Sequence, residues 1–137
     1  MVNEVKAHLN NYRQSPRKVR LVARTVRGQR VEDALTTLSF VPKRAALPLQ
    51  KLLASALANA KNLSLPTENL VVKEITVDAG ATLYRRRPRS KGMANPIRKR
   101  TSHISVTLGV ATNYQQPTTD NKKKIKKVVG SKLSVVS

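Results

Sequence analysis

Residues 81–103 read ATLYRRRPRSKGMANPIRKRTSH and separate two segments that are rich in strand-forming residues. The stretch holds eight Lys or Arg residues and no acidic residue, so it is too charged to belong to a core. It is also far longer than an ordinary hairpin loop of roughly 2–5 residues. Gly92, Asn95 and Pro96 mark a turn region. We therefore predict that the flanking strands continue outward as the arms of a long projecting β-hairpin, residues 79–104.

Arginine dominates this stretch, with six of the eight basic residues. Its planar guanidinium binds phosphate in a bidentate fashion and stacks on bases, whereas lysine acts as a point charge. Because an isolated two-stranded ribbon is marginally stable in water, we predict that this one orders fully only within its RNA. The alternative is a flexible basic loop used for localisation or for loose attraction to nucleic acid.

Three segments have the composition and periodicity of strands. Leu70–Val77 is rich in β-branched residues, and apolar residues alternate with polar ones over His103–Leu108. Val5–Asn10 shows the same period of two, which is typical of a strand with one buried face. The sequence thus predicts one strand near the start of the chain and one on each side of the basic stretch.

A first helix is predicted to begin at Ser15 and Pro16, which suit the N-cap and first helical positions, and to end near Gly28. We expect one face to pack and the other to bind RNA. The alternative is that the basic face is exposed to solvent and has no ligand. Solvent-exposed faces usually mix Glu with Lys, however, and this helix has no acidic residue. The packing face holds Val19, Val22, Ala23 and Val26, and the basic face holds Arg17, Arg20, Arg24 and Arg27.

Two further helices are predicted before the second strand. Val31–Phe40 has the pattern of a short structural helix. Pro42 is expected to open a longer helix, in which Pro48 predicts a kink or a restart because it lacks a backbone N–H group. This third helix should supply much of the core through Leu49, Leu52, Leu53, Ala56, Leu57 and Ala60.

The net charge of +20 is segregated along the chain. Residues 15–30 carry six basic and no acidic residues, and residues 111–137 carry six basic residues against Asp120. Outside these segments and residues 81–103, seven basic residues nearly balance six acidic ones. A surface charged only for solubility would intersperse both signs, so this pattern favours contact with phosphate.

Several other functions are disfavoured by composition. The chain has no cysteine, and His8 and His103 are its two histidines, so neither catalytic nor metal-binding spacing is present and we expect no enzyme activity, metal or cofactor. No apolar run approaches the roughly 20 residues that span a bilayer, and the first residues do not resemble a secretory leader. We expect a soluble, unprocessed chain in the cytoplasm or an organelle matrix. A free DNA-compacting or membrane-active basic protein remains open on composition alone.

Aromatic residues are scarce, namely Tyr12, Phe40, Tyr84 and Tyr114. Folds that read single-stranded RNA stack successive bases on aromatic side chains. We therefore do not expect stacking platforms to dominate binding.

Four motifs, in this order and spacing, resemble the universal large-subunit ribosomal protein number twenty-two family in its bacterial or organellar form. They are SPRKVRLVA (residues 15–23), SALANA (55–60), VKEITVDAG (72–80) and RKRTSHI (98–104). The resemblance extends over about residues 5–108. Met93 stands where the family is expected to have arginine, and Ala81 replaces a common proline.

The resemblance implies an α+β fold in which three helices pack on a small three-stranded antiparallel sheet, with an extended β-hairpin projecting from it. It implies a structural constituent of the large ribosomal subunit that binds 23S-type rRNA, helps to line the nascent-peptide exit tunnel and supports subunit assembly and translation. The partners would be rRNA, neighbouring large-subunit proteins and the nascent polypeptide, with no membrane and no homo-oligomer. We expect an RNA-binding domain over residues 1–110 and a basic C-terminal extension over residues 111–137 that is disordered off the ribosome.

Charge pattern and resemblance together define two sets of candidate site residues. The candidates for RNA contact are Arg13, Ser15, Arg17, Lys18, Arg20, Arg24, Arg27, Arg85, Arg86, Arg87, Arg89, Lys91, Arg98, Lys99, Arg100, Thr101, Ser102 and His103. The candidates for a tunnel-facing tip are Arg87, Pro88, Arg89, Ser90, Lys91, Gly92, Met93 and Ala94.

Overall fold

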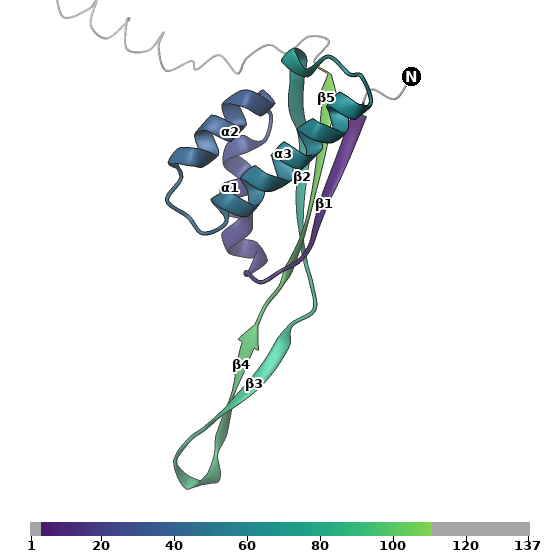
Figure 1. The fold of residues 1–137 in the computed structure, drawn as a ribbon. Coiled ribbons are helices and arrows are strands. Elements are labelled where there is room, and N and C mark those ends of the chain that lie inside the picture. The colour runs from purple at the N-terminus through teal and green to yellow at the C-terminus, as the bar shows by residue number, and fades with distance from the viewer. Residues whose placement is uncertain (1–3, 111–137) are drawn as a thin grey trace, which may run out of the picture.

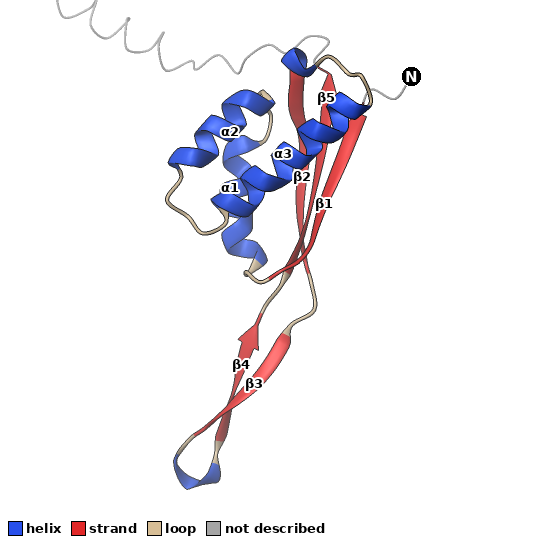
Figure 2. Ribbon diagram, in the orientation of Figure 1, coloured by secondary structure: helices blue, strands red, loops and turns tan. Residues whose placement is uncertain are grey.

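The computed structural model describes residues 4–110 as three helices packed on a three-stranded antiparallel sheet, from which a two-stranded ribbon projects (Figures 1 and 2). This confirms the predicted α+β class. The predicted extension, residues 111–137, lies outside the described residues. The elements in chain order are β1 (Glu4–Tyr12), α1 (Pro16–Val26), α2 (Val31–Phe40), α3 (Ala46–Asn62), a 3-10 turn (Thr67–Asn69), β2 (Leu70–Ala79), β3 (Leu83–Pro88), a second 3-10 turn (Ser90–Gly92), β4 (Ala94–Lys99) and β5 (Ser102–Val110).

The main sheet has the order β1-β5-β2, so the last strand in sequence is the central one. Val106 of β5 pairs with Ala7 of β1 on one side and with Ile75 of β2 on the other. A register shift interrupts β2 between Val72 and Glu74. Since β5 is held by hydrogen bonds on both sides, it fixes the direction in which the hairpin leaves the domain.

The core lies between one face of this sheet and the three helices. The apolar residues predicted to face inward from the first and third helices are buried, apart from Leu57, which is partly buried. β1 and α2 also pack on the core, where Leu9 and Leu35 are partly buried. Burial of each large aliphatic side chain contributes roughly 1.5–3 kcal/mol. The largest side chains that are almost fully enclosed are Leu38, Leu49, Leu53, Leu70, Ile104 and Leu108.

The starts of two helices differ from the prediction. α3 begins at Ala46 rather than at Pro42, because residues 43–45 form a bend and a turn that the Ala46 N–H group closes by donating to the Lys43 oxygen. Pro48 therefore lies in the first turn of the helix, where a missing N–H group has no intrahelical partner to lose, so the helix start lies beside Pro48 and residues 42–45 before it are not helical. At α1, Ser15 occupies the N-cap position as predicted, but its side chain makes no capping hydrogen bond, and its backbone oxygen accepts hydrogen bonds from Lys18 and Val19.

The hairpin also differs in detail from the prediction. β3 and β4 pair with each other in a separate two-stranded sheet, so the strands of the main sheet do not run unbroken into the arms. The turn occupies residues 89–93, where Lys91 and Gly92 have positive φ angles. Asn95 and Pro96, which were expected in the turn, belong to β4. Figure 1 shows the ribbon extending away from the helices and the main sheet.

Candidate nucleic-acid interface

A basic groove of about 800 Å³ lies where the hairpin leaves the domain. One wall comes from the segment that leads into α1, and the other comes from the proximal part of the ribbon. We call this feature the root groove. Its lining residues are Arg13, Gln14, Ser15, Lys18, Arg44, Leu83, Arg85, Arg98, Lys99, Arg100 and Thr101.

Seven of the residues that line the root groove are Lys or Arg, and none is Asp or Glu. Within residues 4–110 the salt bridge that forms is remote from it and joins Lys73 to Glu4. That contact lowers the pKa of the Glu4 carboxyl, through a hydrogen bond from Lys73 and its positive charge, and it raises the pKa of the Lys73 amine for the same reasons. The cations of the root groove have no such acidic partner in the described part of the chain. An anionic ligand would therefore meet a positive electrostatic field that no acidic residue compensates. The concave shape of the groove strengthens this field by focusing it.

Backbone and side-chain hydrogen bonds hold the base of the hairpin in place. The Gly80 N–H group donates to the Thr101 oxygen over 3.0 Å, and the Thr101 hydroxyl donates to the Ala81 oxygen over 2.7 Å. His103 Nδ1 accepts a hydrogen bond of 3.3 Å from the backbone N–H of Asn11, which has a φ of 56°. These contacts join the two arms to each other and to the end of β1, so they orient the ribbon relative to α1.

Gly80 is required at this position by space. A β-carbon placed there would lie 2.4 Å from the Thr101 hydroxyl oxygen and 2.9 Å from His103 Nε2. Both distances are shorter than van der Waals contact. The two arms of the hairpin can therefore approach each other this closely at its base only because residue 80 lacks a side chain.

The ribbon itself presents arginine on both of its faces. Directly paired residues share a face, so Arg85 and Arg87 lie on one face, and Arg86 and Arg98 lie on the other. Pro88 and Pro96 occupy pairs of the same parity, where the backbone N–H would point away from the partner strand, so neither removes a ladder hydrogen bond. Every residue of β3 and β4 is exposed. Polyanion could therefore contact the ribbon from either side.

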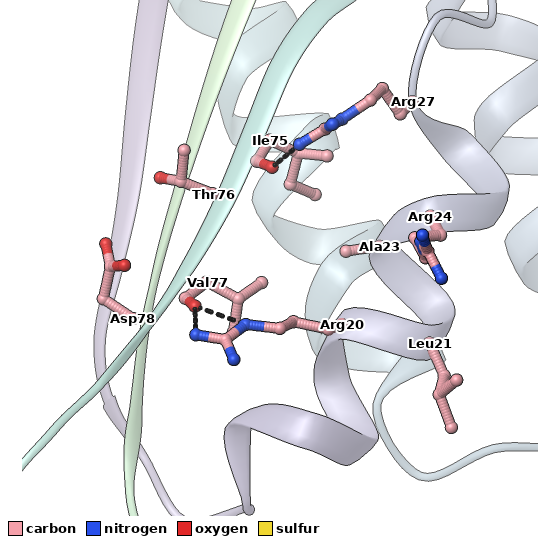
Figure 3. Close-up of a pocket in the computed structure, with 9 residues that line it drawn as sticks. All are labelled: Arg20, Leu21, Ala23, Arg24, Arg27, Ile75, Thr76, Val77 and Asp78. Atoms are coloured by element: carbon pink, nitrogen blue, oxygen red, sulfur yellow. Dashed lines mark hydrogen bonds between the residues drawn. The ribbon is translucent and has the colours of Figure 1, made fainter.

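Two arginines that were predicted to bind RNA make structural contacts in this structure (Figure 3). The Arg20 guanidinium donates two hydrogen bonds, of 2.6 and 2.9 Å, to the Val77 oxygen, and Arg27 donates one of 3.0 Å to the Ile75 oxygen. β2 is an edge strand, and uncovered edges invite pairing with other chains. Arg20 and Arg27 cover that edge, so part of their hydrogen-bonding capacity is used within the domain, and their contact with RNA stays a prediction.

The segment after α1 continues the cover of the same edge. The Gly28 N–H group donates to the Val72 oxygen, and the Val72 N–H group donates to the Gln29 oxygen. Arg17 and Arg24 remain exposed on α1, with no hydrogen bond to the described residues. The free cations of α1 are thus Arg17, Lys18 and Arg24.

Thr101 and Ser102, also predicted to contact RNA, are buried, with exposed fractions of 6% and 0%. The Thr101 hydroxyl is directed to Ala81, and Ser102 belongs to the central strand of the sheet. His103 is partly buried and bonded to Asn11. Their side chains therefore shape the hairpin base, with Thr101 also lining the root groove, and their contact with RNA stays a prediction.

Arg44 is a groove residue that the sequence did not single out. It precedes α3, and its backbone oxygen accepts a hydrogen bond of 3.2 Å from the Tyr12 hydroxyl. This contact ties the turn before α3 to the end of β1, next to Arg13. The adjacent pair Lys43–Arg44 was the available signal, but its distance from other basic segments in sequence hid the association.

The predicted tip residues, 87–94, are all exposed at the end of the ribbon. Among residues 4–110, no group of three or more potential metal-ligating side chains is present. None of the helices in that part of the chain is long and apolar enough to cross a membrane.

Comparison with known proteins places this architecture in a family. Residues 7–109 match the family model for ribosomal protein L22p/L17e. The large ribosomal subunit protein uL22 of Desulfitobacterium hafniense (strain Y51) is 51% identical over 108 residues, which cover 78% of this chain and 95% of that protein. The uL22 proteins of Lactobacillus helveticus (strain DPC 4571) and Streptococcus pyogenes serotype M6 are 48% and 46% identical over 108 residues, with 92% and 95% of each covered. The chain belongs to the ribosomal protein L22p/L17e family.

Proposed function

We propose that this chain is a structural, non-enzymatic constituent of the large ribosomal subunit, located in the cytoplasm and bound to large-subunit rRNA. The observation that carries the proposal is the root groove, which joins the cations near the start of α1 to those of the ribbon with no acidic residue between them. Membership of the L22p/L17e family, and relatives named as large-subunit proteins, support it. The role includes support of subunit assembly and translation.

The rRNA backbone is the ligand that suits this surface. The root groove offers several guanidinium groups, which bind phosphate in a bidentate fashion. From the groove, RNA can continue along both faces of the ribbon, where Arg85, Arg86 and Arg87 follow one another. Because a free two-stranded ribbon is marginally stable, RNA that encloses it would also rigidify it.

The distal ribbon, residues 87–94, is proposed to face the nascent polypeptide in the exit tunnel. Its length beyond the domain and its complete exposure support this role (Figure 2). Neighbouring large-subunit proteins are the expected partners of the domain surface, and no homo-oligomer is proposed. A photo-crosslinker at Lys91 should capture nascent chains on translating ribosomes, and the same group at Lys51 on α3 should not.

The salt dependence of binding tests the RNA proposal. Affinity for a large-subunit rRNA fragment should fall steeply with salt, because each neutralised phosphate releases counterions. Arg98→Ala or Lys99→Ala should weaken binding and reduce the slope of log affinity against log salt by about 1. Lys51→Ala, which removes an exposed charge outside the groove, is the matched control. Salt-independent affinity, or equal effects of all three substitutions, would contradict the proposed groove.

A free DNA-compacting protein is the competing function. It predicts that the chain sediments apart from large subunits in a lysate gradient at physiological salt. The ribosomal proposal requires co-sedimentation with the large subunit, and this measurement separates the two.

A further inference from the structure

Tyr84 is an aromatic residue whose side chain does not pack into the hydrophobic core. It lies in β3, and 66% of its surface is exposed. Among residues 4–110, β3 pairs only with β4, and all residues of both strands are exposed. An aromatic ring buries a large apolar area when it meets a partner, so this ring has surface available for a ligand.

The register places Tyr84 next to a guanidinium group. Tyr84 pairs directly with Arg98 of β4. Two positions toward the tip, Arg86 pairs with Pro96, which cannot donate a ladder hydrogen bond, and hydrogen-bonded and non-hydrogen-bonded pairs alternate in an antiparallel ladder. Tyr84 and Arg98 therefore form a non-hydrogen-bonded pair, the type in which opposite side chains are closest.

Arg98 connects this pair to the root groove, because it also lines that groove. Tyr84 does not itself line the groove, but it shares a ribbon face with Arg98. An RNA strand that leaves the groove along the Arg98 face of the ribbon would pass beside the Tyr84 ring. The ring can accept a base on its face, and the guanidinium can stack or bind the adjoining phosphate. No acidic residue occurs in residues 81–103, which favours RNA over a protein partner at this position.

We propose that Tyr84 and Arg98 form a stacking site for one unpaired nucleobase of the RNA held in the root groove. The inference rests on the proposed RNA-binding function and extends it from phosphate contact to base contact. A base within a continuous A-form helix is covered by its neighbours, so the ligand is a nucleotide in a loop, a bulge or a single strand. The sequence indicated that stacking would not dominate binding, and a single site agrees with that expectation.

Three probes separate base stacking from charge. They are a single-stranded oligouridylate of about a dozen nucleotides, an RNA duplex of the same length, and linear polyphosphate, which has charge but no base. With the full chain, Tyr84→Ala should lower affinity for oligouridylate roughly 5- to 150-fold, the range for loss of one stacked base. Affinity for polyphosphate and for the duplex should change less than about twofold, since the substitution removes no charge.

Two variants control for nonspecific effects. Tyr84→Phe keeps the ring and should retain most of the affinity for oligouridylate. Leu47→Ala removes a side chain of similar exposure, 60%, on α3, outside the ribbon and the groove, and should leave all three affinities unchanged. In a chain without tryptophan, Tyr84→Trp provides a single reporter whose fluorescence should be quenched by oligouridylate and not by polyphosphate.

The outcomes distinguish this site from the broader function. If the unsubstituted chain shows no salt-dependent affinity for any RNA, the proposed function itself fails. If it binds RNA but Tyr84→Ala binds oligouridylate as tightly, the stacking site alone is overturned. Equal weakening toward polyphosphate, or a Tyr84→Phe chain as weak as Tyr84→Ala, overturns it as well.

Discussion

Replacing Gly80 with alanine should destabilise the domain from the base of the hairpin. The new β-carbon would lie 2.4 Å from the Thr101 hydroxyl oxygen and 2.9 Å from His103 Nε2. The imidazole is the end of a longer side chain and can shift. The Thr101 hydroxyl cannot move without leaving the Ala81 oxygen, to which it donates over 2.7 Å.

Two limits bound the expected cost. If Thr101 rotates, one hydrogen bond of about 0.5–1.5 kcal/mol is lost. If Thr101 stays, overpacking of a closed site costs about 1–3 kcal/mol. Because Thr101 is buried, its rotation would also need space, so we expect a loss of about 1–3 kcal/mol in the free energy of unfolding.

Urea unfolding of the full chain, followed by circular dichroism, would measure this loss. The midpoint should fall while the slope with denaturant stays constant. Thr101→Ala removes the clashing hydroxyl, so in the double variant the two losses should be less than additive by at least about 0.5 kcal/mol. Gly92→Ala is the matched glycine control. A β-carbon there meets nothing within 4 Å, and its strain at a φ of 68° is confined to the ribbon tip. An unchanged midpoint for Gly80→Ala, or full additivity in the double variant, would refute this account of the hairpin base.

Three further predictions concern the domain. Arg20→Ala should reduce stability by about 1 kcal/mol, because the Val77 oxygen loses both part-buried hydrogen bonds from the guanidinium. Arg24→Ala should have little effect, and equal losses in thermal unfolding would contradict the edge-covering role. Replacing residues 83–99 with a short turn should leave cooperative unfolding intact, since that segment contributes no buried residue to the core, and a non-cooperative melt would show that arm and core are not separable. Leu53→Ala, at a fully buried position, should cost about 2–5 kcal/mol in the same assay, and a loss below about 1 kcal/mol would mean that the core repacks around it.

Local patterns in the sequence were sufficient for most of the elements. A period of two indicated the buried face of β1 and β5, and a period near 3.6 indicated the buried face of each helix, because burial on one side imposes these spacings. The acid-free segments likewise predicted where uncompensated charge would lie. The residues at which helices begin were harder to predict where they depend on a neighbouring turn, as the start of α3 at Ala46 shows.

The root groove could be found only from the tertiary structure, because its residues come from separate segments of the chain. These segments include Arg13 with Lys18, then Arg44, and then residues 98–100. No local pattern specifies which distant segments become neighbours, because that is set by the order β1-β5-β2 and by packing of the helices on one face. The same limit explains Arg20 and Arg27. The sequence by itself predicted that these residues lie on the basic side of the first helix, outside its apolar face. Only the tertiary structure placed the free edge of β2 within their reach, where backbone oxygens without a strand partner accept their hydrogen bonds.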